Sequence, residues 1–386
     1  MKRAIVTALM AAFAALLSAQ TKPAKPLEIY VIDVEGGKAD LWVTPAGQSI
    51  LIDTATKGDR DLNRILDTIK EAGLTKIDYA ITTHYHVDHA GNLEEIANRI
   101  PITNFVDHGD TVEAPLVAGQ REQIPGFWEK NYPAIYAKGK RISVKPGDKL
   151  PVTGLDWQIV ASGGKVITKP LAGAGKPNPF CAGTERGKIT ADPDDGASVV
   201  SVVGYGKFRL WDGGDMTWDI EHDLMCPNNP IGTVDLYRVN DHGLPDNSAR
   251  EFVHAIQPRV AIVQNGIRKG SAPIVMQVIR TSPGFEDLWQ LHWNTAAGIE
   301  WNSPGVLIAN GMDAAEIAGL VNPPPPPADA PRGGPSTGSG QGGRGGPTNA
   351  NHTPAYSIKV TVQADGMYTV TNMRNKFSKT YTPRAR

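Results

Sequence analysis

The sequence predicts an α/β protein with mixed sheets, and two patterns lead to that fold class. Short strand-like segments separated by glycine-containing turns open the chain between residues 27 and 53, as is typical of antiparallel hairpins. Strand-like and helix-like segments alternate further along, which favours parallel strands joined by helices. A chain of 386 residues can bury a full core, and we expect one domain over residues 20–321.

The elements before residue 101 are predicted from turn residues and from the spacing of apolar residues. Three strands come first: Leu27–Val34, Asp40–Thr44 and Ser49–Asp53. From Asp59 to Gly73, apolar residues recur at helical spacing, and Gly73 is a suitable stop for that helix. A strand over Ile77–Thr83 and a short helix over Gly91–Ile100 complete this part.

The later elements follow the same two patterns. The strand-like runs are Ile142–Val144, Leu155–Ala161, Ser198–Val203, Phe208–Trp211, Val234–Val239 and Val260–Val263. The helical patterns are Asn247–Ile256 and Pro273–Arg280.

Both ends of the chain differ from this domain. Residues 1–19 have the basic start, short apolar stretch and small-residue cleavage site of a secretory signal peptide. Five consecutive prolines and a Gly/Ser/Pro tract make residues 322–355 a predicted disordered linker. Residues 356–386 contain a β-hairpin signal, and since an isolated hairpin is only marginally stable, we expect it to join the main sheet.

Composition and charge narrow the classes of partner and the compartment. With 39 basic and 40 acidic residues, the chain has no overall attraction for nucleic acid, so no stable nucleic-acid partner is expected. No segment after the signal is long and apolar enough to span a membrane, so we expect a periplasmic or secreted protein of unspecified oligomeric state. Cys181 and Cys226 could form one disulfide there, but their spacing does not decide it.

The stretch TTHYHVDHAGN, residues 82–92, holds three histidines and an aspartate within six positions. They are His84, His86, Asp88 and His89. Imidazoles and a carboxylate on a strand-to-helix loop suit zinc or a similar divalent ion, and two groups of ligands suit two ions. The alternative is a solvated loop with chance histidines, but only 9 of 386 residues are histidine. We therefore expect two divalent ions, Zn²⁺ first, with Mn²⁺ or Fe²⁺ as alternatives.

This arrangement resembles the metallo-β-lactamase superfamily. Two later segments extend the resemblance, FRLWDGGDMTWDIE (208–221) and the stretch around VNDHGLPDN (239–247). The resemblance implies an αββα four-layer sandwich with the metal ions at the edge of the sheets. The ligands it implies are His84 and His86 for one ion, Asp88 and His89 for the other, Asp215 as a bridge and His242 as the last imidazole.

The chain resembles in particular the hydrolase domain of the ComEC competence proteins and their free-standing relatives, because DVEGGKAD (33–40) is similar to their DVGQGDA strand. Two departures stand out. Asp241 precedes His242 where the group usually has a second histidine, so it is a possible extra ligand or hydrogen-bond acceptor. Asp195, three residues before Ser198, stands where relatives have asparagine, and many superfamily members have a metal-binding histidine in this motif. An aspartate can bind the same ion, although Asp195 could instead simply belong to a turn.

Carboxylates around the ligands are expected to orient them. Asp53 ends a strand in LIDTA, where the superfamily uses an aspartate to hold the ligand loop. Asp33 is a candidate for similar work in the first turn, but a strand-end carboxylate that satisfies local amides would look the same.

Metal-dependent hydrolysis follows as the expected reaction. Two cations that share Asp215 would share a water molecule and present hydroxide, and Asp88 could shuttle the proton. The ComEC resemblance favours a phosphodiester, either a small molecule or nucleic acid. The alternatives are hydrolysis of a lactone, ester or β-lactam, with Trp128, Tyr132 and Tyr136 walling an apolar pocket, and a non-catalytic metal-binding scaffold. Arg268 and Lys269 form a short basic run, which is more often solvated surface than a substrate clamp.

Overall fold

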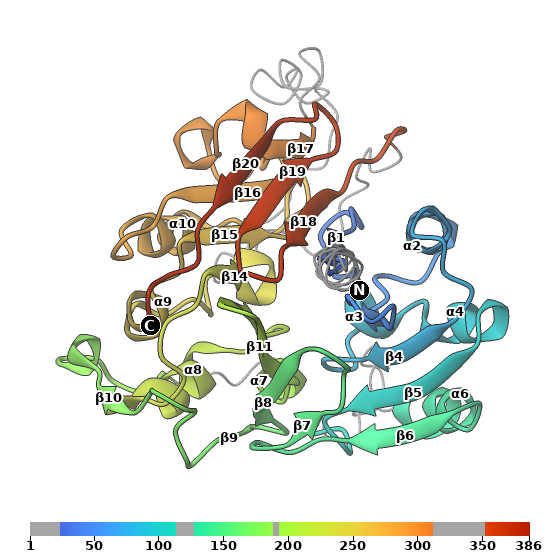
Figure 1. Cartoon of the computed structure of the whole chain (residues 1–386), viewed down its shortest axis with the longest axis horizontal. Helices are drawn as coiled ribbons and strands as arrows, with labels where there is room; N and C mark the ends of the chain where they lie inside the picture. Colours follow the sequence, from blue (N-terminus) through green and yellow to red (C-terminus); the bar gives the residue numbers. More distant parts are fainter. Residues whose placement is uncertain (1–23, 113–126, 188–192, 312–351) are drawn as a thin grey trace, which may run out of the picture.

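The computed structural model describes residues 24–112, 127–187, 193–311 and 352–386. The expected signal peptide and residues 322–351 of the expected linker lie outside these ranges. Within them, the chain forms two nine-stranded sheets and a set of helices (Figure 1).

The first sheet has the strand order β20-β19-β18-β1-β2-β3-β4-β5-β6. Its strands are β1 (Leu27–Val31), β2 (Asp40–Val43), β3 (Ser49–Ile52), β4 (Ile77–Ile81), β5 (Ile102–Asp107), β6 (Lys140–Ser143), β18 (Ile358–Val362), β19 (Tyr368–Asn372) and β20 (Ser378–Tyr381). The strands from β1 to β3 pair antiparallel, and those from β3 to β6 pair parallel. The mixed pairing confirms the predicted fold class.

The second sheet has the order β17-β16-β15-β14-β12-β11-β8-β7, with β9 paired to β8. Its strands are β7 (Lys149–Leu150), β8 (Asp156–Ser162), β9 (Lys165–Val166), β11 (Val200–Tyr205), β12 (Phe208–Asp212), β14 (Leu236–Arg238), β15 (Val260–Val263), β16 (Asp287–His292) and β17 (Ile308–Asn310). A separate short pair joins β10 (Lys176–Pro177) to β13 (Asn228–Asn229).

The helices form the two outer layers, on opposite sides of the molecule in Figure 1. On the side of the first sheet are α2 (Asp59–Glu71), α4 (Leu93–Arg99) and α6 (Tyr132–Tyr136). On the side of the second sheet are α8 (Trp218–Met225), α9 (Arg250–Ile256) and α10 (Pro273–Arg280). Successive side chains of a strand point to opposite faces, so each sheet packs against helices on one face and the other sheet on the other. The αββα four-layer sandwich is therefore confirmed.

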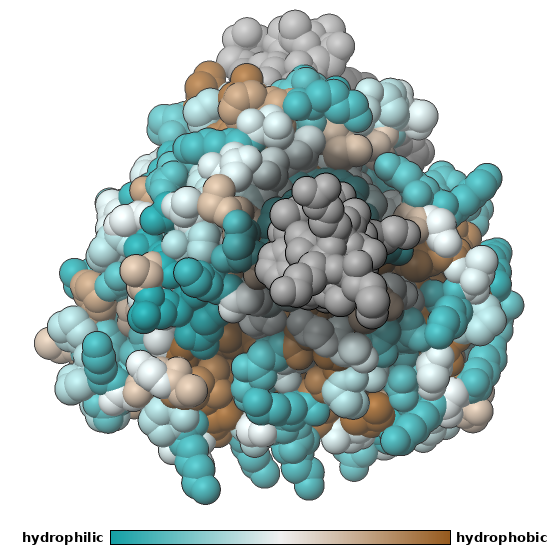
Figure 2. Space-filling view, viewed as in Figure 1, coloured by the Kyte–Doolittle hydropathy of each residue, from teal (hydrophilic) through white to brown (hydrophobic). Residues whose placement is uncertain are grey.

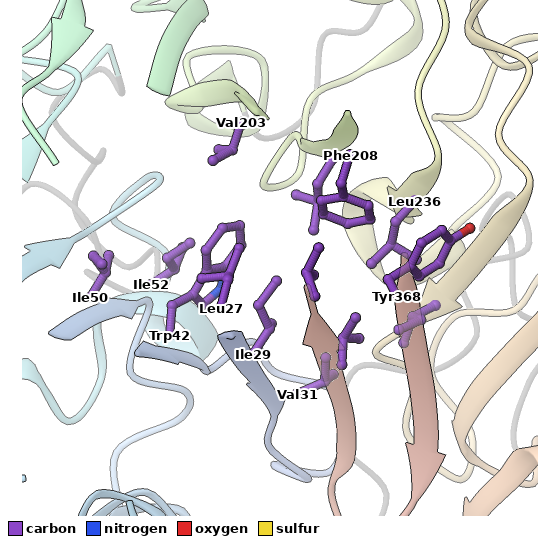
Figure 3. Close-up of a cluster of buried hydrophobic side chains, with 14 of the residues drawn as sticks. Leu27, Ile29, Val31, Trp42, Ile50, Ile52, Val203, Phe208, Leu236 and Tyr368 are labelled. Carbon is purple, nitrogen blue, oxygen red and sulfur yellow. The ribbon is translucent and has the colours of Figure 1, made fainter. Parts of the chain in front are cut away.

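The core between the sheets is rich in aromatic and branched side chains (Figure 3). Trp42 of the first sheet and Trp157 of the second are fully buried, with ring centroids 5.0 Å apart. Tyr368 on β19 packs against Phe208 on β12 in the same layer. Residues at both ends of the chain thus share one core with residues from its middle.

Helix α2 shows how the sequence pattern becomes packing. Its buried side chains include Leu62, Ile65 and Ile69, spaced three and four residues apart on one face. The helix ends at Glu71, and Gly73 follows with a φ of +68°, a conformation that glycine adopts without strain.

The C-terminal strands extend the first sheet, as predicted, because β18 pairs antiparallel with β1. The third strand, β20, is not anticipated by the hairpin signal. The aromatic segment after the first motif was a possible wall of an apolar substrate pocket. In the structure, Tyr132 is instead fully buried among core residues and donates a hydrogen bond to Asp107.

The surface is mostly hydrophilic on the face shown in Figure 2, where hydrophobic residues form several separate patches. Among the described residues, no helix is both long enough and apolar enough to cross a bilayer.

Candidate metal centre

The predicted ligands gather where strands of the two sheets end. The first motif follows β4 and includes the short helix α3 (Val87–Ala90), while Asp195 lies on the short helix α7 (Pro193–Gly196). Asp215 follows β12, and His242 follows β14. Because β12 and β14 run parallel, their carboxyl ends meet at one edge of the second sheet, and loops from both sheets converge there.

One group of ligand atoms consists of His84, His86 and Asp195. Nε2 of His84 lies 3.0 Å from Nδ1 of His86. Oδ1 of Asp195 lies 3.2 Å from the first of these nitrogens and 2.6 Å from the second. The structure therefore brings Asp195 to the position that the sequence proposed for it. Its role as a metal ligand stays a prediction.

A second group consists of Asp88, His89 and His242. The Nε2 atoms of the two histidines are 3.3 Å apart. Oδ2 of Asp88 lies 3.9 Å from that atom of His89 and 3.5 Å from that of His242. Asp88 and His89 are the pair that the resemblance assigned to the second ion, and the structure adds His242 to them.

Asp215 lies between the two groups. Its Oδ2 is 3.0 Å from Nε2 of His89, 3.3 Å from that of His242 and 4.0 Å from that of His84. Its Oδ1 is buried and accepts no hydrogen bond from the described residues. A buried carboxylate oxygen without a donor is costly, and a pair of cations would satisfy it. The side chains therefore fit two divalent ions with a shared carboxylate.

Two of the imidazoles are oriented by hydrogen-bond acceptors on the side of the ring that faces away from the centre. Nδ1 of His89 lies 3.0 Å from Oδ2 of Asp53, and Nδ1 of His242 lies 3.0 Å from the carbonyl oxygen of Gln264. Each acceptor holds the proton on Nδ1 and leaves Nε2 free as a ligand. Asp53 thus lies where the sequence placed it, behind the ligand loop.

Hydroxyl groups complete this support. Thr83 donates its hydroxyl and its backbone N–H to the carboxylate of Asp53, both at 2.7 Å. The Ser198 hydroxyl lies 3.4 Å from Nδ1 of His84 and accepts the backbone N–H of Asp215 at 3.2 Å. Ser198 therefore links the two halves of the centre.

Asp241 is buried beside the second group, and its ligand atom clusters with those of Asp215 and His242. Its φ of +42° and that of His242, +52°, are unusual for these residues and turn the chain sharply at the centre. Burial, and then the neighbouring carboxylates of Asp215 and Asp195, raise the pKa of Asp241 well above its usual value. A protonated Asp241 could donate a hydrogen bond, while a nearby cation would favour its ionised form.

Sequence reasoning missed the neighbour of Asp195. Asp194 is fully buried and accepts the backbone N–H of Tyr85 at 2.8 Å, with Nε2 of His108 at 3.4 Å. Although burial opposes it, hydrogen bonding with His108 lowers the pKa of Asp194. One of two adjacent aspartates thus anchors the ligand loop while the other faces the histidines. The paired Asp-Asp was the only signal in the sequence.

Two other placements differ from the predictions. Asp33 does not support the ligands described above; it contacts His292, His352 and Arg64 instead. It also accepts the backbone N–H of Glu35 at 3.1 Å, so the alternative of a strand-end carboxylate that satisfies a local amide is confirmed. Lys269, assigned to solvated surface, donates to Oδ2 of Asp88 with 28% of its side chain exposed. The physical reason is the same for both: these partners are far apart in sequence and are brought together by the fold.

The comparison with known families bears on this geometry. Residues 40–167 match the family model described as the metallo-beta-lactamase superfamily. Over these residues the chain is similar to members of that superfamily. That match covers the first motif and its supporting Asp53, and the remaining ligands lie beyond it. The ComEC-type resemblance stays a prediction from the sequence.

Several solved structures are similar in part to this chain. One is CmlA, a diiron beta-hydroxylase from Streptomyces venezuelae, at 13% identity and a TM-score of 0.43 over 70% of this chain and 54% of its own. This chain thus spans about half the length of that enzyme. Another is a metal-dependent hydrolase of the beta-lactamase superfamily, at 12% identity and a TM-score of 0.42 over 69% of this chain and 97% of its own.

A third is a diphosphatase from the PhnP family, at 12% identity and a TM-score of 0.34 over 62% of this chain and 87% of its own. At these scores, the likenesses carry no inference about function. No curated protein matches the chain in sequence.

Proposed function

We propose that the protein is an exported hydrolase that binds two divalent metal ions, Zn²⁺ in the first place, and acts on phosphodiesters. The observation that carries the proposal is Asp215, whose Oδ2 lies between the two ligand groups, 3.0 Å from Nε2 of His89 and 4.0 Å from that of His84. When bound, two such cations lower the pKa of a water molecule and polarise the bond to be cleaved.

Residues of the chain orient the imidazole ligands and provide a group for proton transfer. Asp53 and the carbonyl of Gln264 fix two imidazoles so that Nε2 of each points into the centre. Asp88 is the ligand with the most solvent contact, at 22% side-chain exposure. Its Oδ2 can therefore exchange a proton between the centre and the solvent.

Lys269 supports an anionic substrate. Its ammonium group contacts Asp88 at the rim of the centre. Burial lowers the pKa of Lys269, but the negative charges of Asp88 and Asp215 outweigh that effect and raise it. It therefore remains a cation at neutral pH. A cation beside two metal ions would bind a phosphate oxygen and favour a phosphodiester over a neutral lactone or ester.

Export is supported by the disulfide between Cys181 and Cys226. Structural disulfides persist mainly in oxidising compartments such as the periplasm and the extracellular space.

The test compares three substrates with one preparation. The protein is loaded with Zn²⁺ or Mn²⁺ and assayed with bis-p-nitrophenyl phosphate, a lactone and a chromogenic cephalosporin. The proposal predicts turnover of the diester, with Asp215→Asn lowering it by at least about a hundredfold. Turnover of only the lactone or the cephalosporin would show that the substrate is not a phosphodiester. Bound metal with no turnover would indicate a non-catalytic scaffold.

Lys269→Ala separates substrate binding from metal binding. We expect a raised KM for the diester with unchanged metal content, whereas Arg268→Ala, at the neighbouring position, should leave both unchanged. An unchanged KM in Lys269→Ala would remove this residue from substrate binding.

A further inference from the structure

A second cluster of ligand-type side chains lies apart from the centre described above. Its members are Asp33 and Glu35, in the turn after β1, His292 at the end of β16, and His352 shortly before β18. Each offers one ligand atom, and the four atoms all lie within 4.8 Å of one another. Asp33 and Glu35 are two positions apart, whereas His292 and His352 come from distant parts of the chain, so the fold assembles the cluster.

We propose that this cluster is a third metal site, which binds a divalent transition ion of the zinc class through two carboxylates and two imidazoles. Two nitrogens and two oxygens are a donor set that suits tetrahedral Zn²⁺. The site is independent of the proposed hydrolase function, since none of its members belongs to the two groups around Asp215.

The distances are those of converging ligands. Nε2 of His352 lies 3.2 Å from Oδ2 of Asp33, and Nε2 of His292 lies 3.7 Å from Oε2 of Glu35. Ligand atoms about 2.1 Å from a tetrahedral ion lie about 3.4 Å apart. Two closer approaches, His292 to Asp33 and His352 to Glu35, are both 2.5 Å and would widen by roughly 1 Å on binding.

The directions of the atoms support the same conclusion. Nε2 of His352 makes no aligned hydrogen bond with the described residues, although Oε1 of Glu35 is 2.5 Å away. The candidate metal centre has the same feature at Asp195, whose Oδ1 lies 2.6 Å from Nδ1 of His86 without an aligned hydrogen bond. The other close pair of the cluster, Nε2 of His292 and Oδ1 of Asp33, is a hydrogen bond of 2.5 Å. Nε2 of His352 is therefore the ligand atom of this cluster that points toward the shared centre without an aligned partner among the described residues.

Burial and charge allow a cation. The side chains of Asp33, Glu35 and His292 are at most 2% exposed, and that of His352 is 20% exposed. Arg64 also contacts Asp33 at 3.0 Å and Glu35 at 3.5 Å. It balances one of the two carboxylates, and the other lies beside His352 at 2.5 Å. A divalent cation bound by neutral imidazoles would take the place of a proton there.

A bound ion would link both sheets and the segment that leads into the C-terminal strands. Asp33 and Glu35 follow a strand of the first sheet, His292 ends a strand of the second, and His352 leads into the C-terminal strands. The turn that holds Glu35 continues into Gly37, beside the backbone of Asp88. A bound ion would therefore hold the chain ends together and steady a turn next to the candidate metal centre.

Metal content of the full mature protein tests the proposal. The protein is stripped with a chelator, reloaded with Zn²⁺, desalted and analysed by mass spectrometry for metals. We expect about three ions per chain in the wild type and about two in His352→Ala. His222→Ala is the matched control, because His222 contacts Glu251 away from both sites, and it should retain about three.

Two further variants keep the result interpretable. Glu35→Gln preserves the size of the side chain and should also lose one ion. It serves as the test if His352→Ala does not fold. The double variant His86→Ala, His352→Ala should lose one ion more than His86→Ala alone. Equal metal content in the wild type, His352→Ala and Glu35→Gln would overturn the proposal, whether or not the protein hydrolyses any substrate.

Crystals of the zinc-loaded protein give a direct measurement. Anomalous scattering at the zinc edge should show a peak among the four side chains, separate from any peak near Asp215. Side chains ordered at the cluster without an anomalous peak would overturn the proposal, and would indicate a cluster of ion pairs.

Discussion

Gly270 lies beside the centre at a position where an added side chain would clash with the backbone. Its φ is +79°, and a Cβ atom there would lie 2.0 Å from the carbonyl oxygen of His242. Such an approach is far inside van der Waals contact, so any larger residue must push the His242 backbone away. The position of a metal-binding imidazole thus depends on a glycine 28 residues further along the chain.

Gly270→Ala should therefore weaken metal binding at the group of Asp88, His89 and His242, by about tenfold or more. Titration of the stripped protein with Zn²⁺ measures this. Gly47→Ala is the control, because Gly47 also has a positive φ, +83°, but nothing lies near its Cβ position. Both variants carry the backbone strain of a positive φ, so equal Zn²⁺ affinity in the two would contradict the steric argument.

The two carboxylates at the ends of the centre should act on different ions. Asp195 contacts His84 and His86, whereas Asp88 lies near His89 and His242. Asp195→Ala should lower the metal content by about one ion per chain, and Asp88→Ala should impair the other ion. Metal content and the spectrum of the Co²⁺-substituted protein distinguish the two sites. If Asp195→Ala binds as much metal as the wild type, Asp195 is not a ligand.

At the scale of elements, the loop that carries His242 is held to the outer helices by a buried carboxylate. Glu221 on α8 accepts hydrogen bonds from the side chain of Asn240 at 2.7 Å and from the backbone N–H groups of Ser248 at 2.9 Å and Ala249 at 2.6 Å. Burial nevertheless raises the pKa of Glu221 to about 8. Helix α8, helix α9 and the metal-binding loop thus meet at one titratable group.

This raised pKa predicts a pH dependence of stability. Below a pH of about 4.5 the group is protonated in both the folded and the unfolded chain, so its contribution is fully present. As the pH rises toward about 8, the unfolded chain ionises first, and the contribution is lost at about 1.4 kcal/mol per pH unit at most.

Urea unfolding at a series of pH values measures the effect. The free energy of unfolding should fall less steeply between pH 5 and 8 in Glu221→Gln than in the wild type. Glu95→Gln, on α4 with 38% of its side chain exposed, should keep the wild-type slope. Identical slopes in all three proteins would show that Glu221 is ionised in the folded state.

At the scale of the whole molecule, the C-terminal strands complete the core that the two sheets share. Tyr368 is fully buried between Phe208 and Tyr381, with ring centroids 4.9 and 5.2 Å away, and its hydroxyl donates to the carbonyl of Asp235. The last residues of the chain therefore contribute to the stability of strands in its middle.

Tyr368→Ala should destabilise the protein by about 3–5 kcal/mol, because it removes an aromatic side chain from a packed interior. Thermal and urea unfolding measure the loss. Tyr368→Phe keeps the ring and removes only the hydroxyl, so about 1 kcal/mol is expected. A small loss in Tyr368→Ala would mean that the C-terminal strands are docked weakly and are dispensable for the core.

Much of the fold could be predicted because its signals are local. The helical spacing of α2, the strand β15 and the helix α10 depend on residues that are neighbours in sequence, and α10 and β15 have the predicted bounds. The ligand loop from His84 to His89 was equally visible, because four ligand-type residues share six positions. Asp215 and His242 were predicted from resemblance, and the structure brings both to that loop.

The sequence by itself thus determined many of the elements, the α/β class and most residues of one candidate centre, while strands such as β17 and β20 were not expected. Only the tertiary structure decided that Asp33 lies beside His292, 259 residues away, and that Lys269 reaches Asp88, 181 residues away. The physical reason is that periodicity and turn chemistry report on a residue's near neighbours. Contacts between distant residues depend on the order in which strands pair and on how the two sheets pack.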